Sequence, residues 1–321
     1  MKATVIVPTY RRSQRLATLL ECLTRQEGDA LAQVIVCDDG SPDDTAAVAR
    51  SFVSRLPLDY RFQEDLGFRA GQARNMGIAV ARGDILIFLD DDLTVARGFV
   101  AAHVEAHRNA PQPSLFLGLR HRTFTPVDHV PTLEEVAAAE PDDRVAALGP
   151  HGERLREHAT PWMFVYSCNL SVPATAEELH FDDGFLGWGL EDTEFGYRLS
   201  RAGLRIQCAP LARALHIEDP TPRDPFRCEE TARPPSYDTY VRNAVYFMDK
   251  HSDDPAVTEW VRNDLRWYVR DEATGAWVKN GYGNDVEAVI AACRRERNVT
   301  APARNRPSKE SLDERHRTQT V

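Results

Sequence analysis

Short runs of β-branched and apolar residues recur along the first 120 residues, and two of these runs end in clusters of aspartate. Residues 3–7 read ATVIV, residues 33–37 read QVIVC and residues 85–89 read ILIFL. Each run has the length of a buried strand, and amphipathic helical patterns separate them. Strands that alternate with helices in this way are typical of a parallel sheet with crossover helices. The sequence therefore predicts an α/β fold.

The alternating pattern continues to about residue 218, and the sequence after it has a different character. Residues 219–235 carry five prolines, which predicts a loop or lid. Helical patterns follow, so we expect residues 219–300 to form a lid and a helical extension. These patterns lie at about 237–250, 256–270 and 284–297. Residues 301–321 have almost no large apolar side chains, and we expect them to be disordered.

Composition excludes some classes of function. The net charge of −10 argues against a nucleic-acid-binding surface, which would need a basic field. The first residues lack the apolar length of a signal peptide, and no run approaches the ~20 apolar residues of a membrane helix. Six scattered cysteines indicate reduced core thiols, so we expect a cytoplasmic protein without a transmembrane segment. The helical patterns at 237–297 leave homo-oligomer formation and peripheral membrane contact open.

Asp90, Asp91 and Asp92 follow the run at 85–89, so they are expected at the carboxyl edge of the sheet, where open α/β folds bind ligands. If the chain stays extended there, Asp90 and Asp92 project the same way. Two such carboxylates remain ionised cheaply only with a cation between them, and Mg²⁺ or Mn²⁺ suits oxygen ligands. His216 ends a strand-like segment and could complete a metal site, although a lone histidine is usually structural. An acidic turn that caps the next helix is the alternative interpretation.

A second acidic turn, DDGS at 38–41, follows a different strand and should lie at the same edge of the sheet. Asp39 in this turn could accept the imide N–H of a uracil or thymine ring, and an ordinary Asp-Gly turn is the alternative. Arg69, Arg74 and Asn75 lie in the helical pattern before the acidic strand. A guanidinium there suits a diphosphate, whereas a solvated helix face is the alternative.

The third acidic motif, GWGLEDTEF, begins at Gly187. Trp188 lies between two glycines and could offer a flat face to a sugar ring. Glu191 and Asp192 open an amphipathic helix, and the helix dipole favours negative charge there. A carboxylate in that place can take a proton from a hydroxyl group, which is the work of a general base. Helix capping by Asp192, with Trp188 in the core, is the alternative.

The order of these motifs resembles the family 2 inverting glycosyltransferases of the GT-A fold. The likeness is strongest to the catalytic modules of bacterial chondroitin and hyaluronan polymerases, and it covers about residues 3–217. The motifs are VIVPTYRR, VIVCDDGS, DLGFRAGQARNMGIAVARGDILIFLDDD and FLGWGLEDTEFGYRLSRAG, followed by a single histidine. The resemblance implies a Rossmann-like, mixed but mainly parallel sheet flanked by helices. Its nucleotide-sugar half would be about 1–119 and its acceptor half about 120–218.

With the resemblance, the candidate residues take on roles. Expected donor-binding residues are Pro8, Thr9, Tyr10, Arg12, Asp39, Arg69, Arg74, Asn75, Asp90 and Asp91. Asp92 is the implied direct ligand of Mn²⁺ or Mg²⁺, with Asp90 and His216 as further candidates. Asp192, beside Glu191, is the implied catalytic base, and Trp188 with Gly187 is expected to contact the acceptor.

The implied reaction is the inverting transfer of a sugar from a nucleotide-diphosphate sugar to an acceptor hydroxyl. UDP is the expected nucleotide, although dTDP presents the same imide face. The acceptor would be a glycan, a glycolipid or a secondary metabolite. One alternative is a retaining enzyme like the polypeptide N-acetylgalactosaminyltransferases, which lack the Glu-Asp pair; another is an inactive nucleotide-sugar-binding relative. The polymerases join two modules, so a single module argues against alternating polymerisation.

Overall fold

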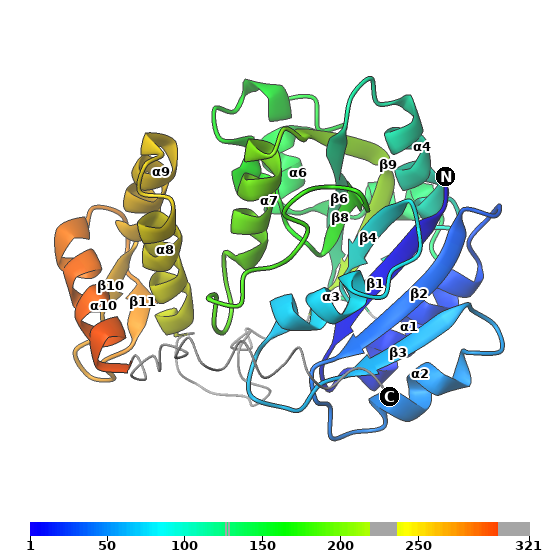
Figure 1. Ribbon diagram of the computed structural model, residues 1–321, viewed down its shortest axis with the longest axis horizontal. Helices are drawn as coiled ribbons and strands as arrows, with labels where there is room; N and C mark the ends of the chain where they lie inside the picture. The colour runs from blue at the N-terminus through cyan, green and yellow to red at the C-terminus, as the bar shows by residue number, and fades with distance from the viewer. Residues whose placement is uncertain (126, 128, 219–235, 301–321) are drawn as a thin grey trace, which may run out of the picture.

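A computed structural model of the chain describes residues 1–125, 127, 129–218 and 236–300. The expected lid at 219–235 and the expected disordered tail at 301–321 lie outside these residues. The described part is a mixed α/β structure, with one large sheet between layers of helices and a group of helices packed at one side (Figure 1).

The first half alternates strands and helices as predicted. Its elements are β1 (Ala3–Thr9), α1 (Ser13–Thr24), β2 (Leu31–Asp38), α2 (Thr45–Ser51), β3 (Leu58–Phe62), α3 (Ala70–Ile78) and β4 (Ile85–Leu89). The four strands pair in parallel in the order β3-β2-β1-β4. The strands expected at 3–7, 33–37 and 85–89 are therefore confirmed. β3 was not predicted, because this edge strand is only partly buried and lacks a continuous apolar run.

The second half completes the sheet with both antiparallel and parallel pairings, and β6 and β9 as bounded below are the parallel pair. Its elements are β5 (Leu93–Val95), α4 (Phe99–Asn109), β6 (Ser114–Thr123), α5 (Leu133–Ala138), β7 (Glu140–Pro141), α6 (Asp143–Leu148), the 3₁₀ turns Leu155–Glu157 and Pro161–Phe164, β8 (Asn169–Pro173), α7 (Glu191–Arg201) and β9 (Arg205–Ile217). The main path of the sheet is β3-β2-β1-β4-β8-β6-β9-β5, with β8 antiparallel to β4. β9 is a single strand that carries His216 near its end.

The C-terminal unit consists of α8 (Asp238–Lys250), α9 (Pro255–Leu265), β10 (Tyr268–Arg270), β11 (Trp277–Lys279) and α10 (Val286–Thr300). The expectation of a helix through residue 270 is wrong, because α9 ends at Leu265 and residues 268–270 pair with β11 as an antiparallel hairpin. The unit shares an apolar core with the sheet domain, to which the domain contributes Trp162, Phe185 and Tyr197.

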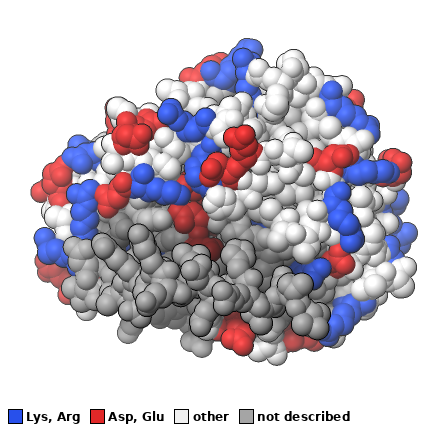
Figure 2. Space-filling model, viewed as in Figure 1, with Lys and Arg blue, Asp and Glu red and all other residues white. Residues whose placement is uncertain are grey.

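The core follows the two-residue period of the strands. Val5 and Val7 of β1 pack into one apolar cluster, and Ile6 packs into the cluster on the opposite face of the sheet. Within the described residues, no helix combines the length and the apolar character needed to cross a membrane. Where Figure 2 shows described residues, acidic and basic side chains are interspersed over the surface.

Gly77 in α3 lies where the helix touches the sheet. A β-carbon at this position would come within 2.6 Å of Cγ2 of Ile6 and 3.0 Å of Sγ of Cys37. We expect Gly77→Ala to lower the free energy of unfolding by about 1–3 kcal/mol, because extra volume in a packed core forces side chains or backbone to shift. Urea unfolding measures this change. A stabilised variant would contradict the packing described here.

Candidate active site

The polar residues predicted from the sequence gather at the carboxyl edge of the parallel strands. Thr9 ends β1, Asp39 directly follows β2, and Asp90 directly follows β4. The turns are joined, because the Asp39 backbone N–H donates to the Thr9 carbonyl oxygen at 2.9 Å. This edge is where open α/β sheets bind ligands. The predicted location of the site is thus consistent with the arrangement of the strands.

Asp39 faces the site and Asp38 does not. One carboxylate oxygen of Asp39 accepts from Gln63 Nε2 at 2.6 Å, and the other accepts from the backbone N–H of Arg69 at 2.7 Å. Burial raises the pKa of Asp39, and these hydrogen bonds oppose the rise. Asp38 is fully buried and accepts from the Tyr60 hydroxyl at 2.6 Å. A carboxylate has about four acceptor sites, so Asp39 retains capacity for a further donor such as a base imide.

Tyr10 and the neighbouring Pro8 belong to the first turn of the site. The Tyr10 hydroxyl donates to Asp65 Oδ2 at 2.8 Å, and this bond is the main cause of a raised Tyr10 pKa. Pro8 is buried in β1, where it pairs with Cys37 of β2. The end of β1 therefore lies beside the turn that contains Asp39.

The three aspartates after β4 point to three different partners. The assumption of an extended chain here is wrong, because the Leu93 backbone N–H donates to the Asp90 carbonyl oxygen at 3.3 Å and closes a turn. The closest partners are Arg74 for Asp90 at 2.8 Å, the Thr9 hydroxyl for Asp91 at 2.7 Å, and Arg12 for Asp92 at 2.6 Å. The turn therefore gives the three neighbouring carboxylates different partners.

Arg12 lies between two of these carboxylates. Its guanidinium is 2.6 Å from Asp92 Oδ2 and 3.3 Å from Asp91 Oδ1. Burial raises the pKa of Asp91 to about 7 despite this neighbour. Burial also opposes ionisation of Asp92, but the hydrogen bond and charge of His216, together with Arg12, hold its pKa below the ordinary value. The pKa values of the two carboxylates are therefore shifted in opposite directions.

Strand pairing brings His216 to Asp92. β9 runs antiparallel to β5 with Leu93 opposite His216, and the imidazole Nε2 lies 3.3 Å from Asp92 Oδ2. Burial disfavours the charged imidazolium, but Asp92 outweighs this and raises the pKa of His216. Nδ1 lies 3.2 Å from Glu218 Oε1.

The Asp92–His216 pair fits a small divalent cation that is completed by a ligand. Within the described ranges, no three His, Cys, Asp or Glu side chains gather as a ready metal site. Mg²⁺ is commonly held by one or two protein carboxylates together with substrate phosphates and waters, so a full protein cage is not needed. Asp90, the third expected ligand, lies 2.8 Å from Arg74, and its part in a cation site stays a prediction.

Arg74 of α3 is the central cation of the site. Its side chain is only 5% exposed and lies between Asp90 at 2.8 Å and Glu191 at 3.5 Å. The guanidinium also lies over the ring of Phe181, with 5.5 Å to the centroid. Its Nε and Nη1 donate no hydrogen bond to any described residue. A buried guanidinium with spare donors suits an anionic ligand such as a diphosphate.

Asn75, expected to face the donor, has a different contact. Its amide nitrogen donates to the Phe181 carbonyl oxygen at 2.8 Å, and its amide oxygen accepts from the Phe181 N–H at 2.8 Å. Both polar ends of the side chain are therefore used to hold the segment before α7 against α3. Arg69 lies nearby and is 3.6 Å from Asp39.

Glu191 and Asp192 open α7 and differ in accessibility. Glu191 is buried beside Arg74, and burial together with the charge of Asp192 raises its pKa to about 7. Asp192 is half-buried and accepts from the backbone N–H groups of Ser167 at 3.2 Å and Thr193 at 2.8 Å. Burial raises the pKa of Asp192 as well. Asp192 is therefore the more accessible carboxylate of the pair.

Trp188 lies in the loop that leads into α7. It is half-buried, and its ring lies 5.4 Å from the ring of Tyr240 on α8. Gly187 and Gly189 on either side have φ of +70° and +112°, which glycine adopts most readily. Sequence reasoning missed the α8 residues at this loop, because no local motif marks them.

Comparison with known proteins identifies a family for the first half of the chain. Residues 4–161 match the sequence profile of glycosyl transferase family 2, and residues 180–220 match that of the N-terminal domain of galactosyltransferase. The chain contains a family 2 glycosyltransferase domain. The resemblance stated from the motifs is thereby confirmed.

Two similar proteins illustrate the relationship. The validoxylamine A glucosyltransferase of Streptomyces hygroscopicus subsp. jinggangensis is 35% identical over 219 residues, which are 62% of this chain and 51% of that protein. The hyaluronan synthase of Pasteurella multocida is 30% identical over 239 residues, which are 67% of this chain and 24% of that protein. The chain therefore spans about half the length of the glucosyltransferase and a quarter of the synthase.

A solved structure of GalNAc-T7 with UDP, GalNAc and Mn²⁺ shows the same fold. The TM-score is 0.58 at 16% identity, and the match covers 93% of this chain and 54% of that one. The GT-A fold expected for the family 2 domain is therefore confirmed, with a curled mixed sheet flanked by helices.

Proposed function

We propose that this chain transfers a sugar from a nucleotide-diphosphate sugar to an acceptor hydroxyl, with inversion at the anomeric carbon. The observation that carries the proposal is the placement of Arg74 between Asp90 on the donor side and Glu191, the neighbour of Asp192, on the other. A cation for the leaving group thus lies beside the pair of carboxylates that includes the proposed base.

The donor side is suited to a pyrimidine nucleotide. Asp39 has acceptor capacity for a base imide, and Arg74 has spare donors for a diphosphate. The GalNAc-T7 structure of the same fold holds UDP, which supports UDP as the nucleotide here. We expect dTDP to be the second choice, because thymine presents the same imide group.

Asp192 supplies the base for the transfer. The acceptor oxygen forms a bond to the anomeric carbon, the bond from that carbon to the nucleoside diphosphate breaks, and the hydroxyl proton moves to Asp192. The backbone N–H groups of Ser167 and Thr193 hold the Asp192 carboxylate in place for this proton transfer. Arg74 stabilises the negative charge that develops on the departing diphosphate.

Asp92 and His216 are the residues that would hold a divalent cation. Mn²⁺ in the GalNAc-T7 structure supports this cofactor, and Mg²⁺ offers the same chemistry. Such a cation neutralises part of the charge on a diphosphate leaving group. Arg12 lies 2.6 Å from Asp92, so Arg12 and the cation would then both contact this carboxylate, or the cation would displace Arg12 from it.

The acceptor is expected to be rich in hydroxyl groups. The relatives are a validoxylamine A glucosyltransferase and a hyaluronan synthase, so their acceptors are the natural first probes. We propose validoxylamine A and a hyaluronan oligosaccharide as test acceptors. A product with retained anomeric configuration would overturn the inverting mechanism and favour a retaining enzyme.

A thermal-shift panel tests the donor site. UDP, dTDP, GDP and CMP are each added with Mn²⁺ or with EDTA, to the unaltered protein and to Asp92→Ala. A ligand that binds only the folded state stabilises it by mass action. At 100 times its Kd the ligand raises the free energy of unfolding by about 2.7 kcal/mol, and Tm rises with it. We expect a shift with UDP that needs Mn²⁺ and is lost in Asp92→Ala.

The outcomes separate binding from cofactor use. A UDP shift that persists in EDTA would overturn the metal dependence while leaving the donor site in place. The absence of a shift with every nucleotide at saturating concentration would contradict the proposed function. Glu272→Ala, an exposed substitution in the C-terminal unit, is the control and should shift like the unaltered protein.

A further inference from the structure

The loop at 186–189 leads directly into Glu191 and Asp192, and side chains of α8 hold its backbone. Each of three carbonyl oxygens in the loop accepts from an α8 side chain. These bonds join Leu186 to Arg242 at 2.6 Å, Trp188 to Thr239 at 3.1 Å, and Gly189 to Asn243 at 2.8 Å. The loop is thus fixed from outside by the C-terminal unit.

The loop needs such support because its backbone is unusual. Gly187, Gly189 and Leu190 all have positive φ, and that of Leu190 is +69°. A left-handed conformation costs free energy in a residue with a β-carbon, and it persists where the surrounding structure enforces it. Leu190 precedes the first residue of α7. The direction in which α7 presents its carboxylates is therefore set by this loop.

α8 packs against the loop without space between them. A β-carbon on Gly187 would come within 2.5 Å of Cγ2 of Thr239, and one on Gly189 within 2.7 Å of Cδ2 of Tyr240. The glycines around Trp188 thus serve a close approach of α8 as well as a backbone turn.

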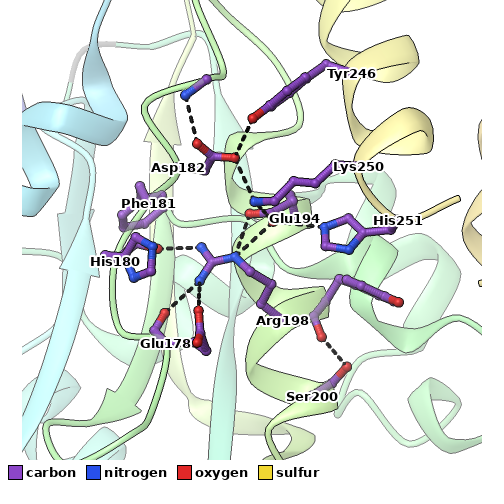
Figure 3. A network of polar contacts seen from close by, with 12 residues as sticks. Glu178, His180, Phe181, Asp182, Glu194, Arg198, Ser200, Tyr246, Lys250 and His251 are labelled. Carbon is purple, nitrogen blue, oxygen red and sulfur yellow. Dashed lines mark hydrogen bonds and ion pairs between the residues drawn. The ribbon is translucent and has the colours of Figure 1, made fainter. Parts of the chain in front are cut away.

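A second set of contacts joins the C-terminal end of α8 to residues before and after the 186–189 loop (Figure 3). Asp182 accepts from Tyr246 at 2.9 Å and from Lys250 at 2.6 Å. Lys250 also donates to Glu194 in the first turn of α7 at 2.6 Å, and His251 lies 3.0 Å from the same oxygen. Glu194 is fully buried, so these partners satisfy a charge that cannot reach water.

Asn243 of α8 contacts two carbonyl groups of the loop. It is fully buried, and its amide nitrogen donates to the Gly189 carbonyl at 2.8 Å and to the Trp188 carbonyl at 3.4 Å. The Gly189 N–H in turn donates to Glu191 Oε2 at 3.3 Å. One side chain therefore links the C-terminal unit to the acceptor-side tryptophan and to the carboxylates of α7.

We propose that Asn243 is a positioning residue, which holds the 186–189 loop so that Trp188 and Asp192 keep their places around the acceptor. The inference rests on the proposed function, because it assigns Trp188 and Asp192 to the acceptor side. It extends that function to the C-terminal unit, which thereby becomes part of the acceptor site.

The test uses the full chain and two substitutions. Asn243→Asp removes the amide donor at nearly constant size. Thr239→Val removes only the hydroxyl donor to Trp188 and is the variant to use if Asn243→Asp folds poorly. Asn263→Asp is the matched control, because Asn263 is an exposed residue of the same unit whose oxygen accepts from Tyr282.

Two measurements are made on each variant. The first is steady-state UDP release from UDP-glucose, with validoxylamine A or with water as the acceptor. With validoxylamine A, we expect both substitutions to raise the KM for this acceptor by about tenfold. With water as the acceptor, we expect them to lower kcat by about tenfold. The KM for UDP-glucose should stay within about twofold in both cases. The second is amide hydrogen exchange of residues 186–191 with UDP and Mn²⁺ present, which should become about tenfold faster in both variants and remain unchanged in the control.

An unchanged exchange rate in this loop would overturn the inference, whatever the activity. Equal changes in the donor and acceptor KM would also overturn it, because a general loss of structure would have that effect. Failure of the proposed function would appear in the unaltered protein, as the absence of UDP binding and turnover. Loop exchange would then be the deciding measurement for the positioning role.

Discussion

Asp192→Asn is expected to lower turnover by about 10²–10⁴-fold, the usual contribution of a general base. Asparagine keeps the shape and can still accept from Ser167 or Thr193, so the fold should be retained. It cannot take the proton from the acceptor hydroxyl. UDP release under single-turnover conditions measures the effect, and the UDP-induced thermal shift should remain that of the unaltered protein.

The pH dependence gives a second readout for this residue. Burial raises the pKa of Asp192, so its base form is lost as pH falls through that raised value. Turnover should therefore decrease on the acid side, and this decrease should change in Asp192→Asn. Glu191 should then ionise more readily, because the charge of Asp192 contributes to its raised pKa of about 7.

Asp183→Asn is the matched control, because Asp183 is an exposed carboxylate in the preceding segment. We expect it to leave turnover unchanged. Activity of Asp192→Asn within about tenfold of the unaltered protein would exclude Asp192 as the principal base.

Arg74→Ala is expected to have the largest effect on stability, because it leaves Asp90 and buried Glu191 without their shared cation. Removal of one partner from a buried ion pair costs about 3–5 kcal/mol, and urea unfolding should show a loss of this size. The UDP-induced thermal shift should disappear as well. Arg74→Lys keeps a charge but cannot reproduce the planar guanidinium, so it should recover part of the stability and little of the UDP binding.

Arg97→Ala serves as the control for arginine removal, because Arg97 is exposed. We expect its free energy of unfolding to change by less than about 0.5 kcal/mol. If Arg74→Ala had the same free energy of unfolding as Arg97→Ala and still bound UDP, the central role of Arg74 would be contradicted.

Local sequence patterns predicted much of the sheet domain. The runs at 3–7, 33–37 and 85–89 are long enough and apolar enough to be buried strands, and all three form in the parallel half of the sheet. Parallel strands end at one edge, so the sequence alone predicted that the acidic turns at Asp39 and Asp90 lie at the same edge of the sheet.

Other features could not be read from local patterns. The helical period continues past Leu265, yet residues 268–270 form a hairpin with β11, because pairing with a distant strand overrides local preference. The contact of Asn75 with Phe181, 106 positions away, has no local signal, and its expected role at the donor stays a prediction. The sequence places no signal at Asn243 or Thr239, because their partners are backbone carbonyls of a loop about 50 positions earlier.

The sequence by itself thus determined the fold class, the family and the edge of the sheet at which the site lies, because these follow from periods of two and 3.6 residues and from motif order. Only the tertiary structure decided which carboxylate meets which cation. His216 reaches Asp92 because β9 pairs antiparallel with β5, and the turn after β4 sends Asp90 to Arg74. Contacts of this kind depend on strand register and helix packing, and a local pattern carries no information about either.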